Sequence, residues 1–392
     1  MLHDWQAELV RWAAQVGRCA IWADTGLGKT VMQLEWARLV GTRSLVIAPL
    51  AVCAQTVREA AKLGLTAAYA RNDNEAPGPG VWVTNYERVK DFTPEGFDAV
   101  VLDEASILKQ SDGKTRTALI EWASHVPRRL ACTATPAPND VEELTSQAEW
   151  VGAMSRVNML AAYFVHDSDA GWRLKGHARR PMLRWMGAWA VALRRPSDLG
   201  YDDAGYILPG LDITPHLIDT VDLTPDDQLF ATDLGGVGGR ARVRKTTLTD
   251  RCQRTAELVA LEPQEPWVLW CGLNDEADTL TALIPGAVNV HGGLPAEEKA
   301  RLLLGFADGD FRVLITKPSL AAFGLNWQHC ARMAFVGLSD SYETYYQAIR
   351  RCYRYGQTRR VHAHIVLSDL EGQIAANVAR KERQATSVLD DL

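Results

Sequence analysis

The sequence predicts an α/β protein built from two parallel-sheet domains. Short apolar runs typical of buried strands alternate with helical stretches from about residue 20 to residue 136, and the alternation returns from Trp267 onwards. Strands that alternate with helices usually form a parallel sheet covered on both faces. The length of 392 residues agrees with two domains, because it is too long for one ordinary hydrophobic core.

Strands are expected where the apolar runs lie. In the first half these runs are Cys19–Ala23, Ser44–Ala48, Val81–Thr84, Ala99–Leu102 and Arg129–Thr133. In the second half they are Trp267–Cys271, Val288–Val290, Val313–Thr316, Met333–Val336 and Val361–Val366. Helical periodicity is present over Val31–Val40, and residues 141–200, rich in Trp and Arg, are predicted to be mostly helical.

A glycine-rich segment separates the two halves. Four of the five residues at 235–239 are glycine, which holds neither a helix nor a strand well, so we predict a flexible joint there. The expected domains are residues 1–215, which include the helical segment 141–200, and residues 249–392, which end in a helix. Residues 216–248 are expected to form the linker.

The composition excludes several classes of protein. No run of eighteen apolar residues exists, so no membrane span is expected, and the N-terminus has no signal-peptide pattern. The seven cysteines contain no CxxC pair, which favours buried thiols in a reducing cytoplasm over disulfides or a zinc site. The formal net charge of −6 argues against polyanion binding by the whole surface, but a local basic groove is compatible with it.

A candidate phosphate-binding turn follows the first expected strand. It contains Gly26, Leu27, Gly28, Lys29 and Thr30, preceded by Ala23, Asp24 and Thr25. Small residues let backbone N–H groups point at an anion, and the N-terminus of the following helix adds positive potential. Lys29 would reach the β- and γ-phosphates of a nucleotide, and the Thr30 hydroxyl would ligate Mg²⁺. The alternative is an ordinary glycine turn.

Two acidic residues end another expected strand. Val100–Leu102 runs into Asp103 and Glu104, which places both carboxylates at the edge where parallel sheets bind ligands. Asp103 would hold Mg²⁺, largely through water, and Glu104 would orient and deprotonate an attacking water. An acidic helix cap is the alternative for this pair taken alone.

These elements belong to an ordered series in which the chain resembles superfamily 2 helicases, most closely the Swi/Snf-like DNA translocases. The matching segments are Leu2–Gln6, Ala23–Thr30, Asp103–Ser106, Thr133–Pro136 with Asn139, Gly324–Gln328 and Gln347–Gln357. The resemblance extends from residue 2 to about residue 366. It departs from the family at Ser106, where the family often has His, and at Arg350, where it often has Asp.

The resemblance implies two tandem RecA-like lobes with an ATP cleft between them, and ATP and Mg²⁺ as cofactors. Gln6 would contact adenine, Thr25 to Thr30 and Gly324 would bind ATP, and Thr133 and Thr135 would couple hydrolysis to DNA. Arg354 would be the arginine finger with Arg351 as its partner, and Gln347 would lie near the γ-phosphate. If they are helical, the two arginines, three residues apart, share one face. An exposed basic helix is the alternative.

By position in the family, the DNA-contacting loops contain Pro49, Thr84, Asn85, Tyr86, His291, Gly292, Thr316 and Lys317. Basic clusters at Arg179–Arg180, Arg194–Arg195 and residues 240–245 could flank the groove, although a charge run more often forms a solvated face. Leu193–Pro196 with Leu208–Pro209 resembles the family's brace against the second lobe. Such contacts read the backbone, so we expect sequence-independent binding that depends strongly on salt.

The leading hypothesis is therefore a DNA-dependent ATPase that moves along duplex or branched DNA. A strand-separating or branch-migrating helicase of repair or recombination is the second hypothesis, and an ATP-gated DNA clamp is the third. We expect a cytoplasmic monomer of bacterial or bacteriophage origin, because the chain is close to a bare motor.

Overall fold

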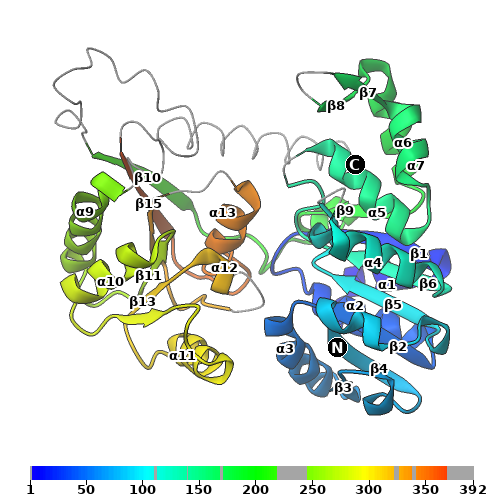
Figure 1. Ribbon diagram of the computed structural model, residues 1–392, viewed down its shortest axis with the longest axis horizontal. Coiled ribbons are helices and arrows are strands. Elements are labelled where there is room, and N and C mark those ends of the chain that lie inside the picture. Colours follow the sequence, from blue (N-terminus) through cyan, green and yellow to red (C-terminus); the bar gives the residue numbers. More distant parts are fainter. Residues whose placement is uncertain are drawn as a thin grey trace. The chain divides into compact units, whose positions relative to one another are not determined.

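The structure is a computed structural model that describes residues 2–109, 113–138, 140–167, 171–218, 245–321, 326–337 and 341–368. The chain divides into two compact units between Tyr206 and Ile207 (Figure 1). In the described part of the chain, no helix combines the length and the apolar character that a membrane crossing requires.

The first unit contains a parallel sheet in the order β3-β4-β2-β5-β6-β1-β9. Its strands are β1 (Arg18–Ala23), β2 (Arg43–Ala48), β3 (Ala67–Tyr69), β4 (Gly80–Asn85), β5 (Ala99–Asp103), β6 (Arg128–Cys132) and β9 (Ala190–Leu193). Its helices are α1 (Asp4–Val16), α2 (Lys29–Val40), α3 (Leu50–Lys62), α4 (Lys114–Ser124), α5 (Leu144–Val151), α6 (Arg156–Tyr163) and α7 (Arg179–Met186). The central strands are buried almost throughout, as expected for a parallel sheet with both faces covered.

The second unit has its own parallel sheet in the order β10-β15-β14-β11-β13-β12. Its strands are β10 (Leu211–Ile218), β11 (Trp267–Cys271), β12 (Val288–Val290), β13 (Val313–Thr316), β14 (Arg332–Val336) and β15 (Val361–Ser368). Its helices are α9 (Leu248–Leu261), α10 (Asn274–Leu283), α11 (Ala296–Asp308), α12 (Pro318–Ala321) and α13 (Tyr342–Ile349). The two sheets confirm the predicted α/β class with two lobes.

The structure corrects the predicted end of the first domain at residue 215. Strand β10 pairs in parallel with β15 along its whole length, so residues 211–218 belong to the second sheet. Side chains reinforce this pairing. Arg360 donates to Asp212 at 2.8 Å, and His216 shares a 3.0 Å hydrogen bond with His364. The sequence signal was weak because the Thr214–Pro215 step and the exposed positions of this edge strand hide its alternation.

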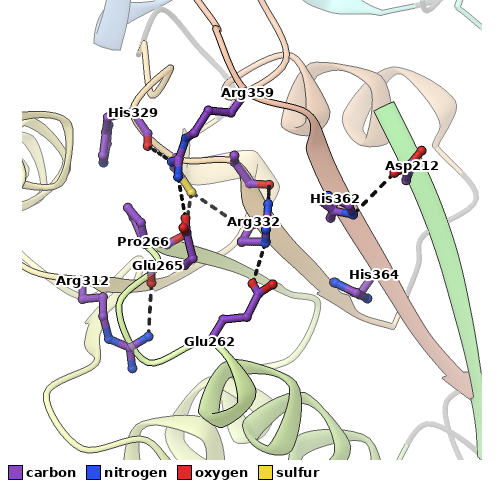
Figure 2. Close-up of polar contacts among 12 residues, drawn as sticks. Asp212, Glu262, Glu265, Pro266, Arg312, His329, Arg332, Arg359, His362 and His364 are labelled. Atoms are coloured by element: carbon purple, nitrogen blue, oxygen red, sulfur yellow. Dashed lines mark hydrogen bonds and ion pairs between the residues drawn. The ribbon is translucent and has the colours of Figure 1, made fainter. Parts of the chain in front are cut away.

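Ion pairs fasten the turns at the amino ends of β14 and β15. Arg332 pairs with Glu262 at 2.5 Å, and Arg359 donates both to Glu265 at 2.7 Å and to the carbonyl of His329 at 2.6 Å. Figure 2 shows these contacts together with the His362–Asp212 pair. They connect the beginnings of β14 and β15 to the end of α9 and to the loops before β11 and β14.

The predicted helical segment 141–200 is also more mixed than expected. It contains the antiparallel hairpin of β7 (Phe164–Asp167) and β8 (Gly171–Leu174), and then β9, which pairs with β1. The glycines at 235–239, most of the predicted linker, the arginines at 240–244 and the predicted C-terminal helix lie outside the described residues.

Candidate active site

A tight turn joins β1 to α2 at the carboxyl edge of the first sheet. Gly26 and Gly28 adopt positive φ angles of 89° and 75°, which L side chains rarely adopt. A Cβ added at Gly28 would lie 2.5 Å from the side-chain nitrogen of Gln6. Gly28 is therefore required both by the backbone and by close packing. The turn ends where α2 begins, at Lys29, so free N–H groups and the positive helix terminus face the same place.

Lys29 lies folded against this turn. Its ammonium donates to the carbonyl of Ala23 at 2.9 Å and to that of Asp24 at 3.3 Å. Thr25 is fixed by the Asp24 carboxylate, which accepts from its backbone N–H at 2.6 Å. Neutral carbonyls thus hold the lysine ammonium inside this turn, Ala23–Thr30, which we call the cradle. A charged phosphate oxygen would be a stronger hydrogen-bond acceptor than these carbonyls.

Gln6 of α1 reaches the cradle from a distant part of the chain. It is buried, accepts from the N–H of His3 at 2.9 Å and donates to the carbonyl of Leu27 at 2.9 Å. His3, Trp5 and Tyr206 form an aromatic cluster next to it, with ring centroids 5.7 to 6.5 Å apart. The residue predicted to contact adenine therefore touches the candidate phosphate-binding turn and lies beside three aromatic rings that pack on one another.

Asp103 ends β5 and is only 6% exposed. Gln33 of α2 donates to its carboxylate at 2.7 Å. Burial raises the pKa of Asp103, while the Gln33 hydrogen bond and the Lys29 charge oppose the rise. Gln33 lies one helical turn after Lys29, outside the sequence motifs that predicted the site.

The donor set at this edge fits a hydrated magnesium ion that a nucleotide would bring. Thr30 and Asp103 offer oxygen ligands, and Gln33 Oε1 is buried without a hydrogen-bond partner among the described residues. Mg²⁺ is usually held by one or two carboxylates, substrate phosphates and several waters. In the described residues, no group of three or more His, Cys, Asp or Glu side chains could hold a metal alone.

Glu104 has a φ of 50°, the one positive value found for a non-glycine residue in the described chain. Such a backbone costs about 1–3 kcal/mol and tends to persist where the surroundings enforce it. Tyr86 is one enforcing group, because its hydroxyl donates to the carbonyl of Asp103 at 2.7 Å and lies 3.4 Å from that of Glu104. Tyr86, predicted as a DNA contact, therefore holds the acidic turn.

The predicted coupling residues lie directly beside the acidic pair. Thr133 donates to the Glu104 carboxylate at 3.4 Å and accepts from the N–H of Thr135 at 3.1 Å. Both threonines are buried, and they follow β6, the neighbour of β5 in the sheet. The segment Thr133–Pro136 thus contacts the segment Asp103–Ser106 through a side chain. Asn139, which was matched to the family together with Thr133–Pro136, lies outside the described residues.

In the second unit the predicted arginines do not lie on a helix. Helix α13 ends at Ile349, and Arg351 and Arg354 lie in the turns that follow it, so the predicted common helical face is wrong. Gln347 is on the helix and is buried, with its amide 3.4 Å from Glu343. Burial, with a contribution from Arg350, lowers the pKa of Arg354 to about 10, while Arg351 is 9% exposed.

Hydrogen bonds fix this turn to the segment before β14. The N–H of Trp327 donates to the carbonyl of Arg351 at 2.9 Å, and Gln357 donates to the carbonyl of Cys330 at 3.0 Å. The segments Gly324–Gln328 and Gln347–Gln357, which both resemble the family, are therefore joined by a hydrogen bond between Trp327 and Arg351. Gly324 lies outside the described residues, so its predicted contact with ATP stays a prediction.

The two departures from the family pattern have local roles. The Arg350 guanidinium lies 5.1 Å from the ring centre of Tyr346 and 5.3 Å from that of Tyr353, a cation–π arrangement. Ser106 is buried in the short 3-10 helix Ala105–Lys109. Neither side chain adds to the residues that were predicted to bind phosphate.

The residues predicted to contact DNA differ in how exposed their side chains are. Thr84 is fully buried, and Thr316 is 1% exposed with its hydroxyl donating to the carbonyl of Val290 at 2.9 Å. Their hydroxyls are therefore not available to a phosphate in this structure, so a DNA contact at these two positions, which stays a prediction, would fall on the backbone. Asn85 is also buried and accepts from the Tyr69 hydroxyl at 2.7 Å. Pro49 is buried just before α3, so a contact at this loop would fall on the backbone or on the exposed Leu50.

His291, Gly292 and Lys317 are placed differently. They line one hollow of about 300 Å³ at the carboxyl edge of the second sheet, together with Asn274, Asp278, Asn289 and Ser319. His291 and Gly292 are exposed, and Lys317 is partly exposed. The second unit therefore offers an imidazole, an ammonium and an open backbone at one place, which is a suitable set for a phosphate oxygen.

Comparison with known proteins gives three results. Residues 1–152 match the SNF2-related domain, and residues 254–356 match the helicase conserved C-terminal domain. The sequence matches no curated protein. Among solved structures, the SWI2/SNF2 ATPase core of Sulfolobus solfataricus in complex with dsDNA is similar, with a TM-score of 0.48 and 20% identity over 99% of this chain and 92% of that chain.

Proposed function

The chain belongs to the Swi/Snf-like group of superfamily 2 and is a DNA-dependent ATPase of that type, and from this premise we propose that it hydrolyses ATP to move along duplex DNA. The first unit would bind the nucleotide in the turn from Thr25 to Thr30. Lys29 would exchange two backbone carbonyls for the β- and γ-phosphate oxygens, which are stronger, charged acceptors.

Hydrolysis would proceed at the carboxyl end of β5. Mg²⁺, held by Thr30, Asp103 and the phosphates, would neutralise charge that develops on the phosphoryl oxygens. Glu104 would accept a proton from the water that attacks the γ-phosphorus. Gln33 and Tyr86 would position the two acids, one through a carboxylate and the other through a backbone carbonyl.

The second unit would contribute positive charge in the transition state. Arg354 would face the γ-phosphate, with Arg351 and Gln347 beside it. The turn that carries the arginines is bonded to the segment before β14, so a shift of one would be transmitted to the other. This arrangement would couple hydrolysis to movement of the second unit.

DNA would be contacted through its backbone. The hollow containing His291, Gly292 and Lys317 supports such a contact in the second unit. In the first unit, Tyr86 directly follows Asn85, and its hydroxyl contacts the carbonyls of Asp103 and Glu104. DNA bound near this loop would therefore be linked to the acidic pair through one side chain.

The observation that carries the proposal is the convergence of Lys29, Asp103, Gln33 and Glu104 on one sheet edge behind a glycine turn. We expect the ATPase rate to rise with duplex DNA and to respond less to single strands or RNA. Lys29→Ala should lower the stimulated rate by more than about 10²-fold, while binding of labelled duplex is retained. Unchanged hydrolysis in this variant would refute the assignment of the phosphate site.

Movement is tested separately from hydrolysis. ATP-dependent displacement of a triplex-forming oligonucleotide from duplex DNA is expected, because a motor that tracks the duplex clears its path. Release of one strand of the duplex itself would instead favour a strand-separating helicase. If the ATPase is active and neither event occurs, the translocation part of the proposal fails.

A further inference from the structure

Strand β8, helix α7 and the segment between them form a strongly basic region, in which the cluster Arg179–Arg180 is the only part predicted to lie near DNA. Between Gly171 and Gly187 the sequence contains no aspartate or glutamate, although the whole chain has a net charge of −6. Its basic residues are Arg173, Lys175, Arg179, Arg180 and Arg184. Such a local excess on an acidic protein produces a positive potential that would attract an anionic partner.

Only part of this charge has an internal role. Lys175 donates to the carbonyls of Ala161 and Ala162 near the end of α6, at 2.9 and 3.3 Å. Arg180 and Arg184 are exposed, and the described part of the chain provides neither of them with an ion pair. They are four residues apart on α7, so both project from the same face of the helix.

The two arginines border a shallow hollow of about 360 Å³ that is lined by Arg180, Pro181, Arg184 and Trp185. The opposite face of α7 is anchored in the core by Met182 and Met186, which are 1% and 0% exposed. Met182 and Met186 therefore pack α7 against the core, while Arg180 and Arg184 face solvent. The helix lies next to α6 (Figure 1).

Trp185 lines the hollow and packs against other rings. It stacks on Tyr163 of α6 at 5.9 Å and meets Trp189 edge-on at 5.4 Å. Trp189 in turn contacts Trp22 at 5.8 Å. Because Tyr163 already stacks on Trp185, the hollow is better suited to a backbone that contacts the arginines than to an inserted base.

From these observations we propose that α7 is a second binding site for the phosphate backbone of duplex DNA, in which Arg180 and Arg184 contact phosphates. The inference rests on the proposed function, which supplies the DNA. The aromatic contacts Trp185–Trp189–Trp22 end on β1, one residue before the cradle residue Ala23, so the site is connected to the ATP-binding turn by packed side chains.

The test measures how duplex affinity depends on salt. Each lost phosphate contact lowers the slope of log K against log salt by about 0.9, so Arg180→Gln/Arg184→Gln should lower it by about 1.8. The loss of affinity relative to the wild type should then be about 12-fold larger at 50 mM than at 200 mM salt. The matched control is Arg71→Gln/Arg301→Gln, which removes two exposed arginines, 60% and 68% accessible, and should keep the slope.

Proximity can be measured directly. All seven native cysteines are buried, so Arg184→Cys introduces an accessible thiol for a photo-crosslinker. Crosslinks to duplex DNA from this position, and none from Arg301→Cys, would support the site. If the wild type binds duplex but the Arg180/Arg184 double variant keeps its slope, the α7 site is refuted and an acidic protein becomes its better partner. If the wild type binds no duplex at all, the proposed function itself fails.

Discussion

The first and second units hold their candidate catalytic charges in different ways. In the first unit Lys29 donates to the carbonyl at the end of β1, and Asp103 accepts from Gln33 of α2. In the second unit Arg351 and Arg354 lie in irregular turns after α13, and burial lowers the pKa of Arg354 to about 10. A cation partly withdrawn from water gains most from a highly charged partner, and a triphosphate is such a partner.

This difference indicates a division of roles. In the proposed function, the first unit would bind the nucleotide in a turn that a strand end and a helix terminus define. The second unit presents cationic groups on a turn that hydrogen bonds tie to the segment before β14. Binding is therefore expected to depend on the first unit, and the rate of the chemical step on both.

Loss of Arg354 should give the largest effect on the rate of hydrolysis. Arg354→Ala is expected to lower kcat by about 10³- to 10⁵-fold, the range for arginine fingers, while nucleotide affinity changes little. Stopped-flow binding of a fluorescent nucleotide, together with the steady-state ATPase rate, measures both quantities.

Arg350→Ala is the matched control for Arg354→Ala, because Arg350 lies in the same turn but contacts Tyr346 and Tyr353. It should change kcat far less. If both variants lower kcat equally, the effect comes from disruption of the turn, and the specific role of Arg354 in hydrolysis is contradicted.

The next largest effect is expected at the strained acid of the first unit. Glu104→Gln keeps the size of the side chain and removes its basicity, so kcat should fall by about 10²- to 10⁴-fold with ATP still bound. Slow single turnover after rapid ATP binding would show this in a quench experiment. Weakened ATP binding with normal turnover would contradict the role of Glu104 as the base.

Tyr86→Phe should give a smaller effect of a different kind. Removal of the hydroxyl takes away one hydrogen bond to the carbonyl of Asp103, worth about 0.5–1.5 kcal/mol, so kcat should fall about 3- to 10-fold with the KM for ATP unchanged. Tyr69→Phe is the control, because its hydroxyl bonds instead to Asn85. Equal losses in both variants would indicate general loosening of β4 rather than positioning of the acids.

The sequence predicted the regular part of this protein well. The strand predictions at Trp267–Cys271, Val288–Val290 and Val313–Thr316 agree with β11, β12 and β13 to the residue. The glycine turn and the acid pair were also located, because short apolar runs and required positive φ angles leave local signals. Burial of Thr84 and Thr316 was not visible locally, since it depends on neighbouring strands and on the carbonyl of Val290.

The two α/β lobes, the motif order and the groups proposed to bind a triphosphate could be read from the sequence. The partners of those groups could be seen only in the folded chain. Gln33 reaches Asp103 across 70 positions of sequence separation, Tyr86 reaches the acidic turn, and β10 joins the second sheet through β15. The physical reason is that periodicity and turn chemistry are local, whereas partners between strands and helices are set by the packing of segments distant in the chain.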